Sequence, residues 1–126
     1  MKKIADAGGR VVLGADWPVS GWISEYRPLV AIETAVTRTI DGRKDVAPLG
    51  GAEAGVSVDT ALRASTINPA LELGMENAIG SLEVGKRADL VVLDENLYEV
   101  DPDRISEVKV LYTMMDGELT WDHTAE

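Results

Sequence analysis

The chain has 126 residues, room for one domain with a modest core, and its hydrophobic content of 45% is that of an ordinary globular protein. Its 22 acidic and 12 basic residues give a formal net charge of -10, which makes nucleic acid and membrane surfaces poor partners. The sequence has no cysteine and a single histidine, His123, so disulfides, thiolate zinc sites and a multi-histidine metal site within one copy are excluded.

The first part of the chain has the pattern of one β/α unit. Residues 2–7 are predicted to end a helix, because a pair of glycines follows them. The unbroken apolar run 11–15 predicts a strand buried on both faces, as in parallel sheets covered by helices, and it ends in Asp16. A helix is predicted from residue 28 to about 40, since a proline suits its first turn and apolar residues recur at spacings of three and four.

A second helical stretch is predicted beyond a long loop. Residues 41–56 lack periodicity and predict that loop. Helix is then expected over residues 58–73, with Ser57 as the first cap. Asn68 precedes a proline and is predicted to cap a restart of the helix, which Gly74 ends.

The remaining segments have the pattern of antiparallel β-structure. The predicted elements are a turn over 82–85, a second buried strand over 88–94, a short helical turn over 101–105, a strand over 108–115 and a hairpin at 116–117 that returns over 118–121. The order along the chain is therefore β/α first and antiparallel β last.

Asp16, at the end of a predicted buried strand, has two interpretations. In barrels and open sheets of this class, functional residues lie at the carboxyl ends of strands, which makes Asp16 the leading candidate for a site residue. Aspartate before Trp-Pro is also a common turn former, and turn aspartates far outnumber catalytic ones. Local sequence leaves both open.

Wider context comes from a set of segments in a fixed order. The longest, from Gly80 to Asp94, joins a turn, a lysine, an acid and an apolar strand. The others are residues 13–19, 35–38, 61–68, 110–113 and 116–117. Together they resemble the carboxyl-terminal part of metal-dependent amidohydrolases, most closely the branch of N-acyl amino acid and formamide-type hydrolases. The resemblance spans nearly the whole chain.

This resemblance implies an α/β fold. The last β/α units of a TIM-type (β/α)₈ barrel would be followed by strands of a small C-terminal β-sandwich, with the barrel incomplete in this chain. Residues 1–78 would form the terminal barrel segment, in which 11–15 is the eighth strand, and residues 79–126 would form the sandwich segment.

The resemblance also assigns candidate site residues. The family's eighth-strand acid binds metal and takes a proton from the hydrolytic water, and Asp16 matches it, so Asp16 is the predicted catalytic residue and metal ligand. Zinc is the expected divalent metal of the complete enzyme. Trp17 and Trp22, with Tyr26, follow the strand and are candidates to bind substrate, with packing as the alternative. Arg38 is a further candidate, with the helix dipole or a nearby acid as the alternative partner.

The resemblance leaves most of the family's metal ligands without a match here. Its first-strand His-x-His pair, its carboxylated lysine or equivalent acid and its two later histidines are absent from this sequence. A catalytic metal site needs three or more protein ligands, so we expect this chain alone to bind no metal and to be inactive. The expected function is part of a metal-dependent hydrolase of amide-type C–N bonds, with a small amide substrate only in the complete enzyme.

Two other functions stay open: a truncated, non-catalytic oligomeric binding or scaffold protein, and an enzyme completed by a partner chain that supplies the histidines. Unpaired strand edges and uncovered helix faces predict self-association, most simply as a homodimer. The sequence shows neither a signal-peptide apolar region nor a membrane-spanning run, so we expect a cytoplasmic protein.

Overall fold

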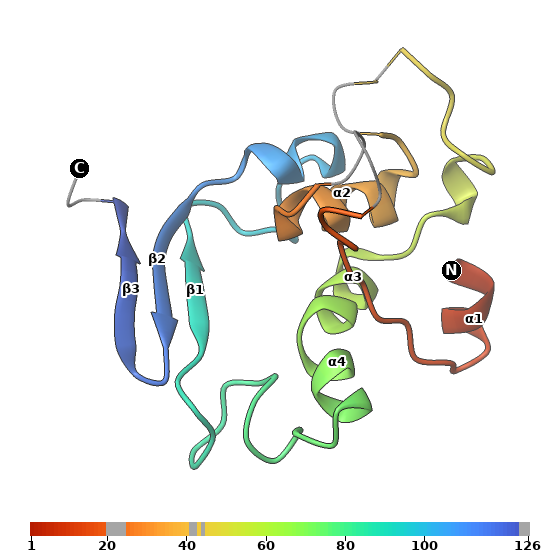
Figure 1. Ribbon diagram of the computed structural model, residues 1–126. Helices are drawn as coiled ribbons and strands as arrows, with labels where there is room; N and C mark the ends of the chain where they lie inside the picture. The colour runs from red at the N-terminus through yellow and green to blue at the C-terminus, as the bar shows by residue number, and fades with distance from the viewer. Residues whose placement is uncertain (20–24, 41–42, 44, 124–126) are drawn as a thin grey trace.

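The structure is a computed structural model that describes residues 1–19, 25–40, 43 and 45–123. It is an α/β arrangement in which short helices gather on one side and a small antiparallel sheet stands on the other (Figure 1). The elements in chain order are α1 (Lys2–Asp6), α2 (Pro28–Thr37), the 3-10 helix η2 (Ala52–Ala54), α3 (Val58–Ser65), α4 (Ile67–Glu72), β1 (Leu90–Leu93), the 3-10 helix η3 (Pro102–Glu107), β2 (Val110–Met115) and β3 (Glu118–Asp122). Among the described residues, no helix has the length and apolar content needed to cross a membrane.

Helix α2 begins where the sequence predicts and ends earlier. Pro28 occupies its first turn, where a missing N–H costs nothing. Arg38 adopts a left-handed conformation with φ 64° and its N–H donates to the Thr34 carbonyl at 3.0 Å, which closes the helix. The predicted extension to residue 40 is therefore wrong.

Helices α3 and α4 occupy the helical stretch expected over 58–73, with a break close to the predicted restart. Ser57 caps α3 as predicted, because its side chain accepts from the Thr60 N–H at 3.1 Å. The chain breaks at Thr66, with φ -129° and ψ -88°, and α4 follows directly. The prediction that Asn68 caps the restart is wrong, since Asn68 lies inside α4. Gly74, at φ 66°, follows the end of α4 as expected.

Residues 11–15 do not form the predicted strand. The only sheet within the described ranges is β1-β2-β3, and the 11–15 run is extended chain outside it. Its backbone bonds instead to the helices, since the Leu13 N–H donates to the Ala64 carbonyl at 2.9 Å. Burial on both faces is also wrong, because Val12 is 40% exposed. A strand requires another strand along its edge, and here that neighbour is a helix pair.

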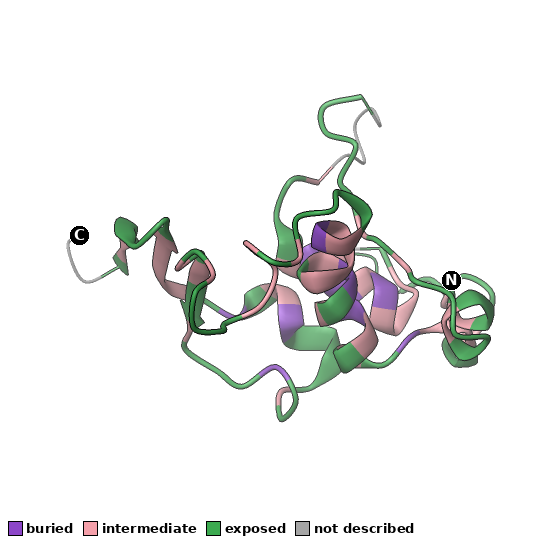
Figure 2. Ribbon diagram, turned by 90° about the horizontal axis from the view of Figure 1, so that it is seen from below, coloured by how far each residue is buried: buried purple, intermediate pink, exposed green. Residues whose placement is uncertain are grey.

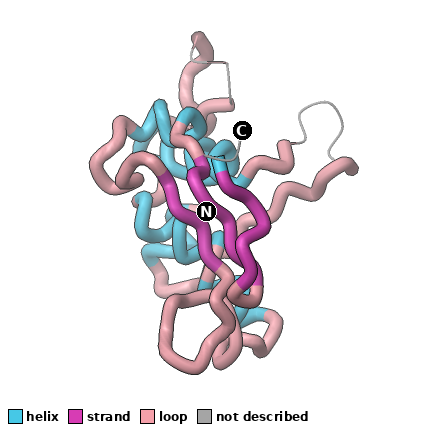
Figure 3. Tube along the Cα trace, turned by 90° about the vertical axis from the view of Figure 1, so that its left-hand side faces the viewer, coloured by secondary structure: helices cyan, strands magenta, loops and turns pink. Residues whose placement is uncertain are grey.

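The three strands form an antiparallel sheet in sequence order and run side by side (Figure 3). Asp116 and Gly117, at φ 53° and 83°, make the predicted tight turn between β2 and β3. The prediction that β1 is buried is wrong: Val91 and Val92 are 57% and 40% exposed, although they point to opposite faces.

The hydrophobic core lies between α2, α3 and the η3 region. Its buried members are Ile32, Ala35, Val56, Ala61, Leu97, Ile105 and Val108. Figure 2 shows most of the buried positions gathered on the helices, while the strands are exposed or intermediate.

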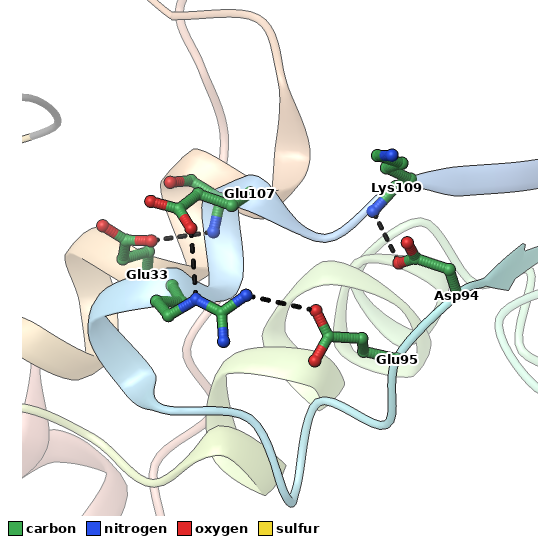
Figure 4. Close-up of polar contacts among 7 residues, drawn as sticks. Glu33, Asp94, Glu95, Glu107 and Lys109 are labelled. Carbon is green, nitrogen blue, oxygen red and sulfur yellow. Dashed lines mark hydrogen bonds and ion pairs between the residues drawn. The ribbon is translucent and has the colours of Figure 1, made fainter.

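One buried charge joins α2 to η3. The Glu33 carboxylate is buried on α2 and accepts from the Ser106 N–H at 2.7 Å (Figure 4). Around it, Arg104 bonds Glu107 at 3.2 Å and pairs with Glu95 at 3.5 Å. Carboxylate bonding to an otherwise unpaired backbone N–H ties the two elements together across the core.

Candidate functional site

Asp16 lies where the extended 11–15 segment turns away from the helices. Its φ of 51° is left-handed, and its carbonyl accepts from the Val19 N–H at 2.8 Å, which closes a turn. The residue is exposed. The backbone of Asp16 therefore makes a turn, as one interpretation predicts, and the residue is exposed at the end of the extended segment, where the other interpretation expects a site residue.

The structure brings two of the predicted aromatic residues together beside Asp16. The rings of Trp17 and Tyr26 meet edge to face, with centroids 6.1 Å apart and planes at 66°. Both side chains are exposed. Trp22 lies outside the described residues. The pair offers an aromatic surface next to the candidate acid, with an apolar area left open to solvent.

Arg38 lies at the other end of α2, about 15 Å from the helix start by the rise of its ten residues. Its Nε donates to the Leu49 carbonyl at 3.3 Å, and the Leu49 N–H donates back to the Arg38 carbonyl at 2.8 Å. Arg38 also lines a cavity of about 180 Å³ with residues of the following loop. These contacts close the loop after α2, while Trp17 and Tyr26 lie before that helix.

The residues that the structure describes do not by themselves make a metal site. No group of three or more histidine, cysteine, aspartate or glutamate side chains converges anywhere in 1–19, 25–40, 43 and 45–123. The single histidine, His123, comes directly after the end of β3 and is not part of the sheet. A catalytic divalent ion needs about three protein ligands, so Asp16 is at most one member of a set whose other members are not in the described part of this chain.

A larger open groove, of about 850 Å³, runs between the α3–α4 pair and β1. Large concave sites are the usual candidates for ligand binding, but Asp16 is not among the residues that line this one. One polar contact crosses it: the Tyr98 hydroxyl, after β1, donates to the Asp59 carboxylate of α3 at 3.2 Å. The groove marks the junction of the helices with the sheet.

A turn at one end of this groove is held by charge. The Lys86 ammonium lies 2.6 Å from the Ser81 hydroxyl and 2.9 Å from the Glu83 carboxylate. The Ser81 hydroxyl, and after it Lys86, lower the pKa of Glu83 below its usual value. These contacts stabilise the turn that leads into β1.

Sequence reasoning missed the residue that holds the chain before Asp16. The Asn68 side chain donates from Nδ2 to the Val11 carbonyl at 2.9 Å, across 57 residues of sequence. The dipeptide Asn-Pro is the same whether Asn caps a helix or bonds to a segment distant in sequence. Nothing in the local pattern separates the two roles.

Comparison with known proteins places this chain in a family. Residues 1–120 match the model of the amidohydrolase family, so the chain belongs to that family. It is 41% identical over 125 residues to a protein named N-substituted formamide deformylase from Arthrobacter pascens, covering 98% of this chain and 21% of that protein. Over 67 residues it is 42% identical to the mouse N-acetylglucosamine-6-phosphate deacetylase, covering 53% of this chain and 14% of the relative.

A solved structure agrees with this assignment. The amidohydrolase from Thermotoga maritima superimposes with a TM-score of 0.69 at 28% sequence identity, over 97% of this chain and 25% of that one. The chain thus spans about a fifth to a quarter of the length of the relatives it matches along its whole extent. The resemblance inferred from the sequence motifs is confirmed at the level of the family.

Proposed function

We propose that this chain supplies the C-terminal catalytic segment of a metal-dependent hydrolase of amide-type C–N bonds, with Asp16 as its acid. The observation that carries the proposal is an exposed aspartate on a tight turn directly after the extended 11–15 segment. A family match over residues 1–120 supports it, as do relatives named deformylase and deacetylase.

Asp16 would accept and then donate one proton during the hydrolysis. Water adds to the amide carbonyl carbon and gives up a proton to the Asp16 carboxylate. Asp16 then passes that proton to the nitrogen as the C–N bond breaks, which yields a carboxylic acid and an amine. The divalent metal, with zinc as our choice, would make hydroxide available near neutral pH. Its remaining ligands would come from protein outside this chain, and the chain alone would be inactive.

The whole enzyme would place these residues in a larger frame. We propose that residues 1–78 are the end of a (β/α)₈ barrel, with 11–15 paired as its last strand, and that 79–126 contribute to a small β-sandwich. The uncovered apolar side chains on both faces of the sheet support this, because strands of that kind are stable when covered. The 28% identical Thermotoga neighbour supports it as well.

Substrate contacts would come first from the aromatic pair. Trp17 and Tyr26 present an apolar surface next to Asp16, and Trp22 belongs to the same stretch of sequence. Arg38 would reach the same substrate only if that substrate extended along α2, because it lies at the opposite end of the helix.

A second candidate is a non-catalytic oligomer, and the exposed apolar sheet favours it. Val91, Met115 and Trp121 are exposed apolar side chains of the three strands, which a second copy could cover. We propose that the isolated chain self-associates, as a dimer. Sedimentation of a compact monomer at micromolar concentration would contradict this.

The test of the catalytic proposal is a segment exchange. This chain replaces the matching 125-residue segment of the Arthrobacter pascens deformylase, which is 41% identical to it. The hybrid should bind zinc and hydrolyse an N-substituted formamide, and Asp16→Asn should lower its kcat about 100-fold or more. Asp6→Asn removes an exposed carboxylate on α1 and serves as the matched control.

Two results would contradict the proposal. A folded hybrid without hydrolysis would refute the catalytic assignment of the chain. Full activity in the Asp16→Asn hybrid would refute the role of Asp16. Metal analysis of the chain alone is a further check, since we expect no stoichiometric divalent ion; zinc uptake with amide hydrolysis by the isolated chain would also contradict the account.

A further inference from the structure

The segment that leads to Asp16 is held along one edge by two hydrogen bonds from the helices. The Val11 carbonyl accepts from Asn68 Nδ2 at 2.9 Å, and the Leu13 N–H donates to the Ala64 carbonyl at 2.9 Å. In extended chain, the polar groups of residues two apart lie on the same side. The α3–α4 pair therefore bonds this edge as a neighbouring strand would, as the path of the chain beside α3 suggests (Figure 1).

The break between the two helices suits this arrangement. The Ala64 carbonyl lies near the end of α3, where the last turn leaves carbonyls without helical partners. The sharp change of direction at Thr66 starts α4 at once, and Asn68 follows within its first turn. A main-chain acceptor and a side-chain donor thus face the same short stretch of extended chain.

We infer that Asn68 is a positioning residue for Asp16, an assignment that rests on the proposed function. Asp16 follows Leu13 by three residues, so the bonds at Val11 and Leu13 hold the chain shortly before it on its N-terminal side. Of these two bonds, only the one from Asn68 comes from a side chain. A substitution at Asn68 can therefore remove it without changing the backbone. A shift of about 1 Å in a catalytic group costs roughly 100-fold in rate.

The sharpest variant is Asn68→Asp. It keeps the size of the side chain, removes the NH₂ donor and sets a carboxylate oxygen against the Val11 carbonyl. Asn77→Asp makes the same chemical change at an exposed position and is the matched control. Asn68→Ala removes the donor without adding charge, and it serves if Asn68→Asp fails to fold.

The first measurement is amide hydrogen exchange on the chain itself. In Asn68→Asp, exchange at the Leu13 N–H should accelerate at least tenfold, while the Ser106 N–H, bonded to Glu33 across the core, should keep its protection. Asn77→Asp should change neither. Unchanged exchange at Leu13 in both Asn68 variants would overturn the inference.

The second measurement uses the formamide-hydrolysing hybrid. Asn68→Asp should lower kcat at least tenfold with KM within a factor of two, because substrate contacts are kept and the acid is displaced. Asn77→Asp should leave both unchanged. Faster Leu13 exchange with an unchanged kcat would overturn the positioning role. An inactive unmodified hybrid would instead refute the proposed function, which separates the two failures.

Discussion

The helices and the sheet of this molecule use similar apolar side chains in different ways. Helices α2 and α3, together with η3, bury theirs in a shared core that contains Ile32, Ala61 and Ile105. Strands β1, β2 and β3 pair through their backbones in an antiparallel sheet, yet Val91 and Leu119 stay mostly exposed. Backbone pairing within a sheet therefore does not by itself bury the apolar side chains of its strands.

The two predicted buried strands show the same separation of pairing from burial. Residues 90–93 have a strand neighbour, so they form β1, and its central residues Val91 and Val92 stay exposed. Residues 11–15 lie against helices without a strand neighbour, so they stay extended and form no strand. An apolar run can pair with another strand or pack against a helix, and the tertiary contacts decide which of the two occurs.

The largest expected effect contrasts the core with the sheet directly. Ile105→Ala should lower the free energy of unfolding by about 4 kcal/mol, because the fully buried side chain leaves a cavity. Val91→Ala, at 57% exposure, should cost about 0.5 kcal/mol. Urea unfolding of both variants checks this. Equal costs would show that the sheet is covered in solution, for instance by a second copy.

A smaller effect is expected where the loop before α3 touches α2. Gly55→Ala should cost about 3 kcal/mol, since a Cβ there would overlap the Val36 carbonyl oxygen. Gly14→Ala, with open space around its Cβ, should stay within about 0.5 kcal/mol of the unchanged protein. Thermal unfolding measures both. If Gly55→Ala unfolded at the same temperature as the unchanged protein, this loop would pack less closely than the core it borders.

The hydrogen bond between α2 and η3 should contribute less to stability than the side chain of Ile105 or the close approach at Gly55. Glu33→Ala removes the acceptor for the Ser106 N–H and should destabilise the fold by about 2 kcal/mol. Glu118→Ala, on the exposed start of β3, should have no measurable effect on the urea midpoint. Glu33→Gln keeps an acceptor and should recover part of the loss. Equal destabilisation by Glu33→Ala and Glu118→Ala would contradict the expected difference between the buried helices and the exposed sheet.

The smallest effect concerns an exposed pair ahead of α2. Hydrogen bonds from the Arg27 side chain and backbone lower the pKa of Glu25 from its usual 4.5 to about 2. Because the folded pKa is lowered, any stabilisation is present above pH 4.5 and lost as pH falls toward 2. Arg27→Ala should raise the pKa of Glu25 toward 4.5, measured by NMR titration of the carboxylate. An unchanged pKa would show that the pair does not form.

Much of the local structure and the family follow from the sequence. The Ser57 cap, the start of α2 at Pro28 and the Asp116-Gly117 hairpin were predictable, because each depends on the sterics and hydrogen bonding of a few adjacent residues. Asp16 could be singled out by its place after an apolar run. Its geometry, on a left-handed turn beside Trp17 and Tyr26, could not.

What the sequence determined by itself is the approximate positions of α2, of the helical stretch over α3 and α4 and of strands β1 to β3, the Ser57 cap, the Asp116-Gly117 turn and membership of the amidohydrolase family. The tertiary structure decided that residues 11–15 bond to helices, that β1 is paired but uncovered, and that Asn68 reaches Val11. The physical reason is the distance along the sequence between the interacting residues. Caps and turns are settled by neighbours in the chain, whereas strand pairing, burial and the partner of a side-chain amide depend on residues brought close only by folding.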